Sequence, residues 1–161
     1  MILEFCQWLE HTSLGVAIGE SLWLFPILES LHVIALAVVV GSIAMMDLRL
    51  LGALARDRAV TELAAETLPL TWGAFAAAAI TGFLLFASNA SYYYDNTPFR
   101  VKIVLLGLAG ANMLYFHRAT WRTVSTWDRA AQLPIAARLA GAVSLGTWIL
   151  VVIFGRWIGF V

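Results

Sequence analysis

A carboxylate and an imidazole stand three residues apart in a long apolar stretch of this chain. Glu29 and His32 are the only strongly polar side chains between Trp23 and Asp47. Positions i and i+3 share one face of a helix, so both groups should point at the same neighbouring element. Ionisable groups within a membrane-like segment are costly and mark functional sites. We therefore take this pair as the first candidate site.

The chemistry of a single buried imidazole points to haem. A neutral histidine is a common axial ligand of haem iron, so His32 is the expected iron ligand of a b-type haem. Glu-x-x-His is also half of a di-iron carboxylate site, but the sequence has no second copy, which disfavours a di-metal centre. The alternative is structural: Glu29 and His32 satisfy each other and Lys102, which locks the helices together.

Three cations are expected near the same membrane face as this pair. Arg100 and Lys102 open one apolar stretch, and Arg156 closes another. They are expected either to hold the two haem propionates or to neutralise Glu20 and Glu29.

The second axial position is less defined. With a rise of 1.5 Å per residue, His32 lies roughly 14 Å inward from Trp23. His117 lies roughly 27 Å from the same face, so it should not reach the same iron and is expected to be interfacial. The remaining candidates are Met113, Asn112, Lys102 and His32 of another subunit.

Composition defines the surroundings of these residues. Of the 161 residues, 61% are hydrophobic and 12% are charged, whereas soluble domains average about 25% charged residues. Such a chain cannot cover a soluble surface, so its main solvent should be the lipid bilayer. The net charge is zero, which offers no footprint for nucleic acid. We expect a single transmembrane domain over 1–161.

Four apolar stretches are long enough to cross a bilayer, which takes about 20 residues each. The expected fold is all-α, a four-helix transmembrane bundle, with spans at about 22–50, 68–89, 98–118 and 134–160. An amphipathic pattern at about 2–11 predicts a helix lying in the membrane interface, and Gly15 and Gly19 should loosen the chain after it. Pro69 is expected near the start of the second span.

The basic residues predict the orientation. Seven of the ten flank the first and third loops: Arg49, Arg56, Arg58, Arg118, Arg122, Arg129 and Arg138. Cytoplasmic loops carry an excess of Lys and Arg. We therefore expect a multi-pass protein of the bacterial inner membrane with both termini outside, and a solvated charged run from Asp47 to Arg58.

The second span is rich in small residues, among them Gly73 and Gly82. Small side chains allow close packing of helices in lipid. They would equally leave room for a flat cofactor, and the sequence leaves both interpretations open.

Two stretches resemble known membrane proteins. Residues 23–51, WLFPILESLHVIALAVVVGSIAMMDLRLL, resemble the haem-bearing helix of HemJ-type protoporphyrinogen oxidases and the matching helix of CopD-like copper-resistance proteins. Residues 98–118, PFRVKIVLLGLAGANMLYFHR, are similar to the HemJ helix that opens with a lysine. The resemblance implies that His32 binds haem b and that Lys102 is important for activity. The chain also resembles small uncharacterised bacterial four-helix membrane proteins that have the same Glu-x-x-His and Asp-Leu-Arg-Leu elements.

The sequence thus predicts a b-type haem-binding membrane protein, in the class of membrane oxidoreductases. It would transfer electrons or assist the oxidation of a lipid-soluble substrate such as a quinol (the reduced form of a quinone) or a porphyrinogen, alone, as a homo-oligomer or in a larger membrane complex. The alternative is a non-catalytic accessory or scaffold subunit. Copper handling is a third possibility, against which the scarcity of thioether and imidazole ligands argues.

Overall fold

The computed structural model describes residues 1–130 and 132–160, and in this part all regular structure is helical. Four helical segments are long and apolar enough to cross a membrane, which confirms the all-α four-span fold: α3 (Leu24–Leu50), α4 (Val60–Ser88), α6 with its continuation (Thr97–Thr126), and α7 with η3 (Ile135–Phe160). The protein is therefore a multi-pass membrane protein.

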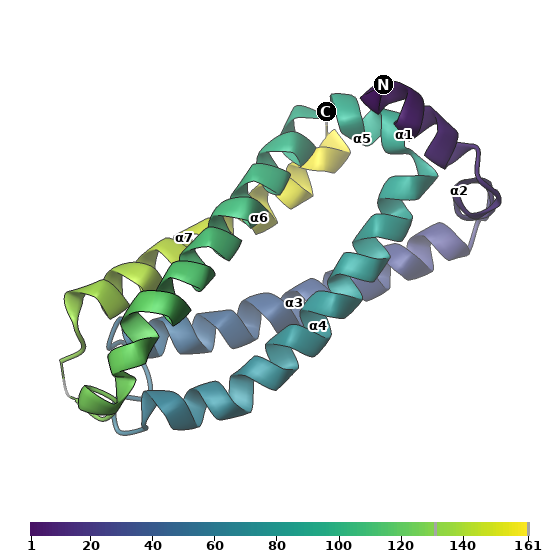
Figure 1. Ribbon diagram of the computed structural model, residues 1–161. Helices are drawn as coiled ribbons and strands as arrows, with labels where there is room; N and C mark the ends of the chain where they lie inside the picture. Colours follow the sequence, from purple (N-terminus) through teal and green to yellow (C-terminus); the bar gives the residue numbers. More distant parts are fainter. Residues whose placement is uncertain (131, 161) are drawn as a thin grey trace.

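The four long helices form two pairs (Figure 1). Helix α3 packs along α4 and α6 packs along α7, while α7 also crosses α3. We call the end that holds both termini the terminal end, and the end that holds the loop 51–59 the loop end. The pairs meet at the loop end and diverge toward the terminal end.

The predicted N-terminal helix is present as α1 (Ile2–Glu10), at the terminal end. Its buried side chains, Cys6 and Leu9, pack with Ala87 of α4 and with the short helix α5 (Ala90–Asp95). The carboxylate of Glu10 accepts hydrogen bonds from the backbone N–H of Ser91 at 2.7 Å and from its hydroxyl at 2.9 Å. Glu10 thereby fixes α1 to the start of α5.

The expectation that Gly15 and Gly19 loosen the chain is wrong. A second short helix, α2 (Ser13–Gly19), forms there, and the Thr12 hydroxyl accepts a hydrogen bond from the N–H of Gly15. A Cβ on Gly15 would lie 2.6–2.9 Å from the carbonyl oxygens of Leu9, Glu10 and Ala87. Glycine is thus needed for close packing of α2 on α4 rather than for chain freedom.

Helix α4 begins at Val60, well before the predicted start at about residue 68, so Pro69 lies inside the helix. The early start follows from a tertiary contact. Asp128 accepts from the backbone N–H of Thr61 at 2.8 Å and from its hydroxyl at 2.7 Å, which satisfies the end of the helix as a cap would.

The third span is also longer than predicted. Helix α6 (Thr97–Tyr115) is α-helical, η1 (Phe116–Thr120) is a π-helical turn, and η2 (Trp121–Thr126) is a 3₁₀ helix. Phe116 of η1 and Trp127, which follows η2, belong to an apolar cluster at the loop end. Its buried members are Leu50, Val60, Phe116, Trp127, Leu133, Ala137 and Ala140.

The expected solvated charged run is wrong for its first two members. Asp47 is 4% exposed and Arg49 is 1% exposed. The Arg49 guanidinium donates to the carbonyl of Arg58 at 2.9 Å and to that of Asp128 at 3.4 Å. Arg49 therefore joins α3 to both of the connections that close the loop end.

We expect Asp128→Ala to remove an acid-dependent part of the stability. Burial raises the pKa of Asp128, but the hydrogen bonds from Thr61 and the charge of Arg129 lower it more, to below its usual value. A carboxylate with a lowered pKa stabilises the fold above the pKa of the unfolded state, about 4, and this stabilisation is lost as the pH falls through the folded pKa. The difference in unfolding midpoint between wild type and variant should shrink from about pH 7 to about pH 3.

Circular dichroism of the protein in detergent measures this difference. Asp57→Ala changes an exposed acid in the loop and serves as the matched control, with little effect at either pH. A wild-type-to-variant difference that stayed constant across this range would contradict the assignment of Asp128 as an ionised cap.

Candidate functional site

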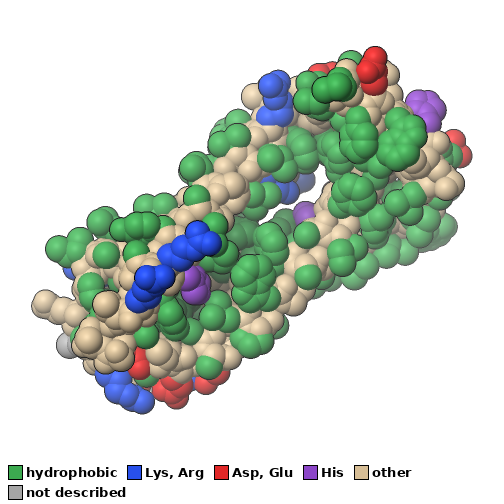
Figure 2. Space-filling view, in the orientation of Figure 1, with side chains coloured by type: hydrophobic (Ala, Val, Ile, Leu, Met, Phe, Trp, Pro, Cys, Tyr) green, Lys and Arg blue, Asp and Glu red, His purple; other side chains and the backbone are tan. Residues whose placement is uncertain are grey.

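The two helix pairs enclose a hollow where they diverge toward the terminal end. Figure 2 shows this opening, with a histidine and a basic side chain at its margins. His32 lies on α3 and Lys102 on α6, and they are close enough for the charge of Lys102 to act on the imidazole. The structure therefore brings together the two residues that carry the strongest chemistry in the sequence.

The hydrogen bonds of His32 define which ring nitrogen is free. Its Nδ1 lies 3.0 Å from the hydroxyl oxygen of Thr81 on α4. The same hydroxyl lies 2.7 Å from the carbonyl oxygen of Ala77, which can only accept, so the hydroxyl proton goes there. Nδ1 must then carry a proton and donate to Thr81. The lone pair of Nε2 is left available to a ligand, as in histidines that bind metals.

Gly82 of α4 leaves the space that the imidazole of His32 occupies. A Cβ at this position would lie 2.8 Å from Cε1 and 3.3 Å from Nδ1 of His32. Side-chain atoms are not found that close, so the ring sits where only glycine leaves room. Thr81 and Gly82 together fix the position and the orientation of His32.

Lys102 borders the hollow from the other helix pair. Its side chain packs on Gly155 of α7, where a Cβ would lie 3.5 Å from Nζ and 3.7 Å from both Cδ and Cε of Lys102. Within residues 1–130 and 132–160 no carboxylate forms an ion pair with it. A cation in an apolar bundle without a counter-charge is costly, so this position favours an anionic ligand.

Three other predicted site residues lie toward the terminal end and are exposed: Glu29, Arg100 and Arg156. The charge of Glu29 acts on Tyr93 of α5; burial raises the pKa of Tyr93, and Glu29 raises it further. The Arg156 guanidinium lies over the ring of Phe160, 4.8 Å from its centroid. The proposed contact of Glu29 with His32 is absent from the described hydrogen bonds and ion pairs.

Met113 is placed away from His32. Met113, Asn112 and His117 line a different cavity of about 250 Å³, nearer the loop end, which His32 does not reach. Asn112 donates to the carbonyl of Ala140 at 3.0 Å. Among the predicted second-ligand candidates within the chain, Lys102 is the one whose charge acts on His32.

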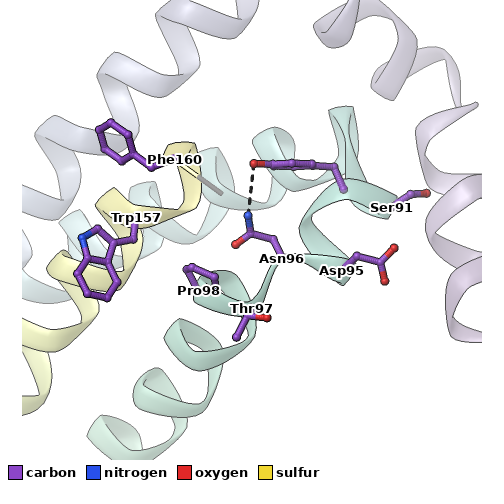
Figure 3. Close-up of a pocket in the computed structure, with 8 residues that line it drawn as sticks. Ser91, Asp95, Asn96, Thr97, Pro98, Trp157 and Phe160 are labelled. Atoms are coloured by element: carbon purple, nitrogen blue, oxygen red, sulfur yellow. Dashed lines mark hydrogen bonds between the residues drawn. The ribbon is translucent and has the colours of Figure 1, made fainter.

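A further hollow, of about 740 Å³, opens at the terminal end (Figure 3). Its lining includes Trp157 of α7 and Phe160 of η3 on one side, and Asn96 and Pro98 at the start of α6 on the other. The Asn96 amide donates to the Tyr92 hydroxyl at 3.3 Å. None of the predicted site residues lines this hollow, so we do not assign it to the site.

The ligand groups limit the kind of metal that the hollow can hold. In the part of the chain that the structure describes, no three His, Cys, Asp or Glu side chains gather in a way that could hold a metal ion. A metal at His32 would therefore have to bring most of its own ligands, as haem iron does.

Sequence reasoning did not find Thr81 as a partner of His32. The two are far apart in the chain, and a threonine in a small-residue helix gives no signal of its own. Gly82 was visible as a small residue, but its contact with His32 depends on how α4 turns against α3.

The fold and the site define a multi-pass helical membrane protein with a polar pair facing a hollow between its helices. Residues 5–161 match a family of unknown function, DUF6644, and the chain belongs to that family. Comparison with curated proteins and with solved structures gave no match.

Gly82→Ala should destabilise the protein because the new methyl group would displace the His32 ring and break its hydrogen bond with Thr81. Overpacking of this kind costs about 1–3 kcal/mol. Gly73→Ala lies on the same helix with open space around it and should be neutral or slightly stabilising, since alanine favours helix. Unfolding midpoints in detergent measure both changes.

The double variant His32→Ala, Gly82→Ala provides the decisive comparison. Once the imidazole is removed, the alanine at residue 82 has room, so its penalty should vanish. If Gly82→Ala lowered the unfolding midpoint equally with and without His32, its cost would not come from contact with the imidazole ring.

Proposed function

We propose that this protein binds one b-type haem in the hollow between its helix pairs, with Nε2 of His32 as the iron ligand. The haem would serve electron transfer or the oxidation of a lipid-soluble substrate within the membrane. The observation that carries the proposal is the hydrogen bond of Nδ1 to Thr81, which leaves the lone pair of Nε2 available to a metal in the neutral ring.

The groups around the hollow match what haem requires. Beside the hollow lie the imidazole of His32, Gly82 of α4 in contact with it, and Lys102, which forms no ion pair within residues 1–130 and 132–160. Haem brings four nitrogen ligands, an apolar ring and two carboxylates, one of which Lys102 would neutralise. When bound, it would supply one-electron redox chemistry, while Thr81 and Gly82 hold the ligand in orientation.

The HemJ-like pattern supports the same function. Its two positions that carry over to this chain, His32 and Lys102, come from separate helices and border the same hollow. A haem ligand and an anion-binding lysine would need this arrangement, whereas a copper site would need further soft ligands.

The alternative of a non-catalytic accessory subunit rested on mutual satisfaction of Glu29, His32 and Lys102. Glu29 is exposed and its charge acts on Tyr93, while His32 is bonded to Thr81. This arrangement favours the haem proposal over the polar lock, and the accessory subunit remains as an outcome of the test below.

Purified protein expressed with adequate haem should show a Soret band and, on reduction, an α band. His32→Ala should lose both while the protein still inserts, because the spans are set by hydrophobicity. His117→Ala is the matched control and should keep both, since His117 lines the other cavity. Lys102→Met should lower the haem content, because the anionic ligand loses its counter-charge.

Other outcomes would decide between the alternatives. A colourless wild type that binds no added haem would favour the accessory subunit. Loss of the spectrum in both histidine variants would contradict the assignment of the ligand to His32 alone. Half a haem per chain with a low-spin bis-histidine spectrum would indicate that two copies share one haem through His32.

We also propose that both termini face the outside of a bacterial inner membrane, because the basic residues gather at the loop end. In a Cys6→Ser background, a cysteine at the exposed Glu20 should react with a membrane-impermeant maleimide in intact cells. A cysteine at the exposed Asp57, in the loop 51–59, should react only after lysis. The reverse labelling pattern would overturn this orientation.

A further inference from the structure

The cavity of about 250 Å³ nearer the loop end is a second site, separate from the hollow at His32. It lies among α3, α4, α6 and α7, and its wall combines polar side chains with aromatic rings. Its size is below that of typical whole-ligand pockets, about 300–1,000 Å³, so it suits a small head group rather than a whole lipid.

Asp47 of α3 places a carboxyl group in the wall of this cavity, and it is 4% exposed. The hydroxyl of Ser144 on α7 is its side-chain hydrogen-bond partner. The second carboxylate oxygen, Oδ2, is buried without any hydrogen-bond partner in the described part of the chain. A buried acceptor without a partner is rare and calls for an explanation, and a donor on a ligand would supply one.

Three other hydroxyl groups in the wall, those of Thr67, Thr71 and Ser42, have no proton left to donate to Asp47. Thr67 donates to the carbonyl of Leu63 at 2.9 Å. The hydroxyls of Thr71 and Ser42 share a hydrogen bond at 2.7 Å, and each also lies within hydrogen-bond distance of a backbone carbonyl, that of Thr67 at 2.8 Å and that of Val39 at 3.0 Å. Because each hydroxyl has one proton, these three groups can offer only lone pairs to a ligand.

His117 adds a second acceptor. Its Nδ1 lies 2.9 Å from the carbonyl oxygen of Met113, which can only accept, so Nδ1 carries the proton. In the neutral ring Nε2 is then an acceptor, and His117 lines the same cavity as Asp47. Asp47 and His117 thus provide two acceptors on separate helical segments, which suits a ligand with two donors.

The aromatic wall faces the lipid. Trp72 and Phe75 of α4 line the cavity with rings in edge-to-face contact, 6.1 Å between centroids, and Trp72 is 52% exposed. Helix α4 packs on α3 rather than on α6, and its exposed Trp72 lines the cavity, so we expect a ligand to enter past α4 from the bilayer. This route favours a neutral, lipid-soluble ligand over an ammonium ion.

We infer that this cavity binds the head group of a hydroquinone, with one hydroxyl donating to Asp47 and the other directed at His117. The inference deepens the proposed function by giving the lipid-soluble substrate its own site. The oxidised quinone has only acceptors, so the same wall should bind it more weakly than the hydroquinone.

The experiment measures the binding of three probes to the purified full-length protein in detergent by anaerobic calorimetric titration. Tetramethylhydroquinone should bind at least about tenfold more tightly than its dimethyl ether, because the ether has lost the donors. It should also bind more tightly than tetramethylquinone. In Asp47→Leu, which removes the acceptor and keeps an apolar side chain, the preference for the hydroquinone over the ether should fall about tenfold.

Two matched variants control the measurement. Leu108→Met changes an exposed apolar side chain of α6 that does not line the cavity and should leave the preference unchanged. His32→Ala should also keep it, so that failure of haem binding is distinguished from failure of this site. The inference is overturned if wild type does not bind the hydroquinone or binds it no better than the ether. It is also overturned if Asp47→Leu, with wild-type helicity by circular dichroism, keeps the full preference.

Discussion

The closure of the loop end by two charged groups, the buried Arg49 and the partly exposed Asp128, is the interaction on which the rest of the structure depends. Arg49 holds the carbonyls of two connections, and Asp128 holds the first turn of α4. An apolar cluster packs at the same end. Because the helix pairs are joined there, they can diverge at the other end without falling apart. The hollow that contains His32 and Lys102 is a consequence of this one-sided closure.

The four spans could be predicted from the sequence because lipid imposes a simple rule of length and hydrophobicity on each crossing helix. The ends of the helices could not, because they depend on contacts between distant segments. The start of α4 at Val60 requires Asp128, and the helix α2 requires Gly15 to meet the carbonyl of Ala87. Neither contact leaves a pattern in the local sequence. The burial of Arg49 was missed for the same reason.

In the candidate site, too, some features could be predicted from the sequence and others depend on contacts between distant segments. An ionisable residue in an apolar stretch is conspicuous, so His32 and Lys102 could be selected from the sequence alone. The choice of the free ring nitrogen could not, because it depends on Thr81, whose hydroxyl is in turn directed by Ala77. Met113 was an equally reasonable ligand by type, but α6 carries it past His32 to the other cavity. Asp47 was assigned to solvent because its neighbours in sequence are charged, whereas packing against α7 buries it.

His32 and Asp47 lie on the same straight helix, fifteen residues apart, which is about 22 Å along its axis. The apolar part of a bilayer is about 30 Å thick, so the two sites sit at different electrical depths. Charge that passed between them would move through much of the transmembrane potential, at about 2.3 kcal/mol per elementary charge for each 100 mV spanned. The length of α3 would therefore couple any exchange between the two sites to the energised state of the membrane.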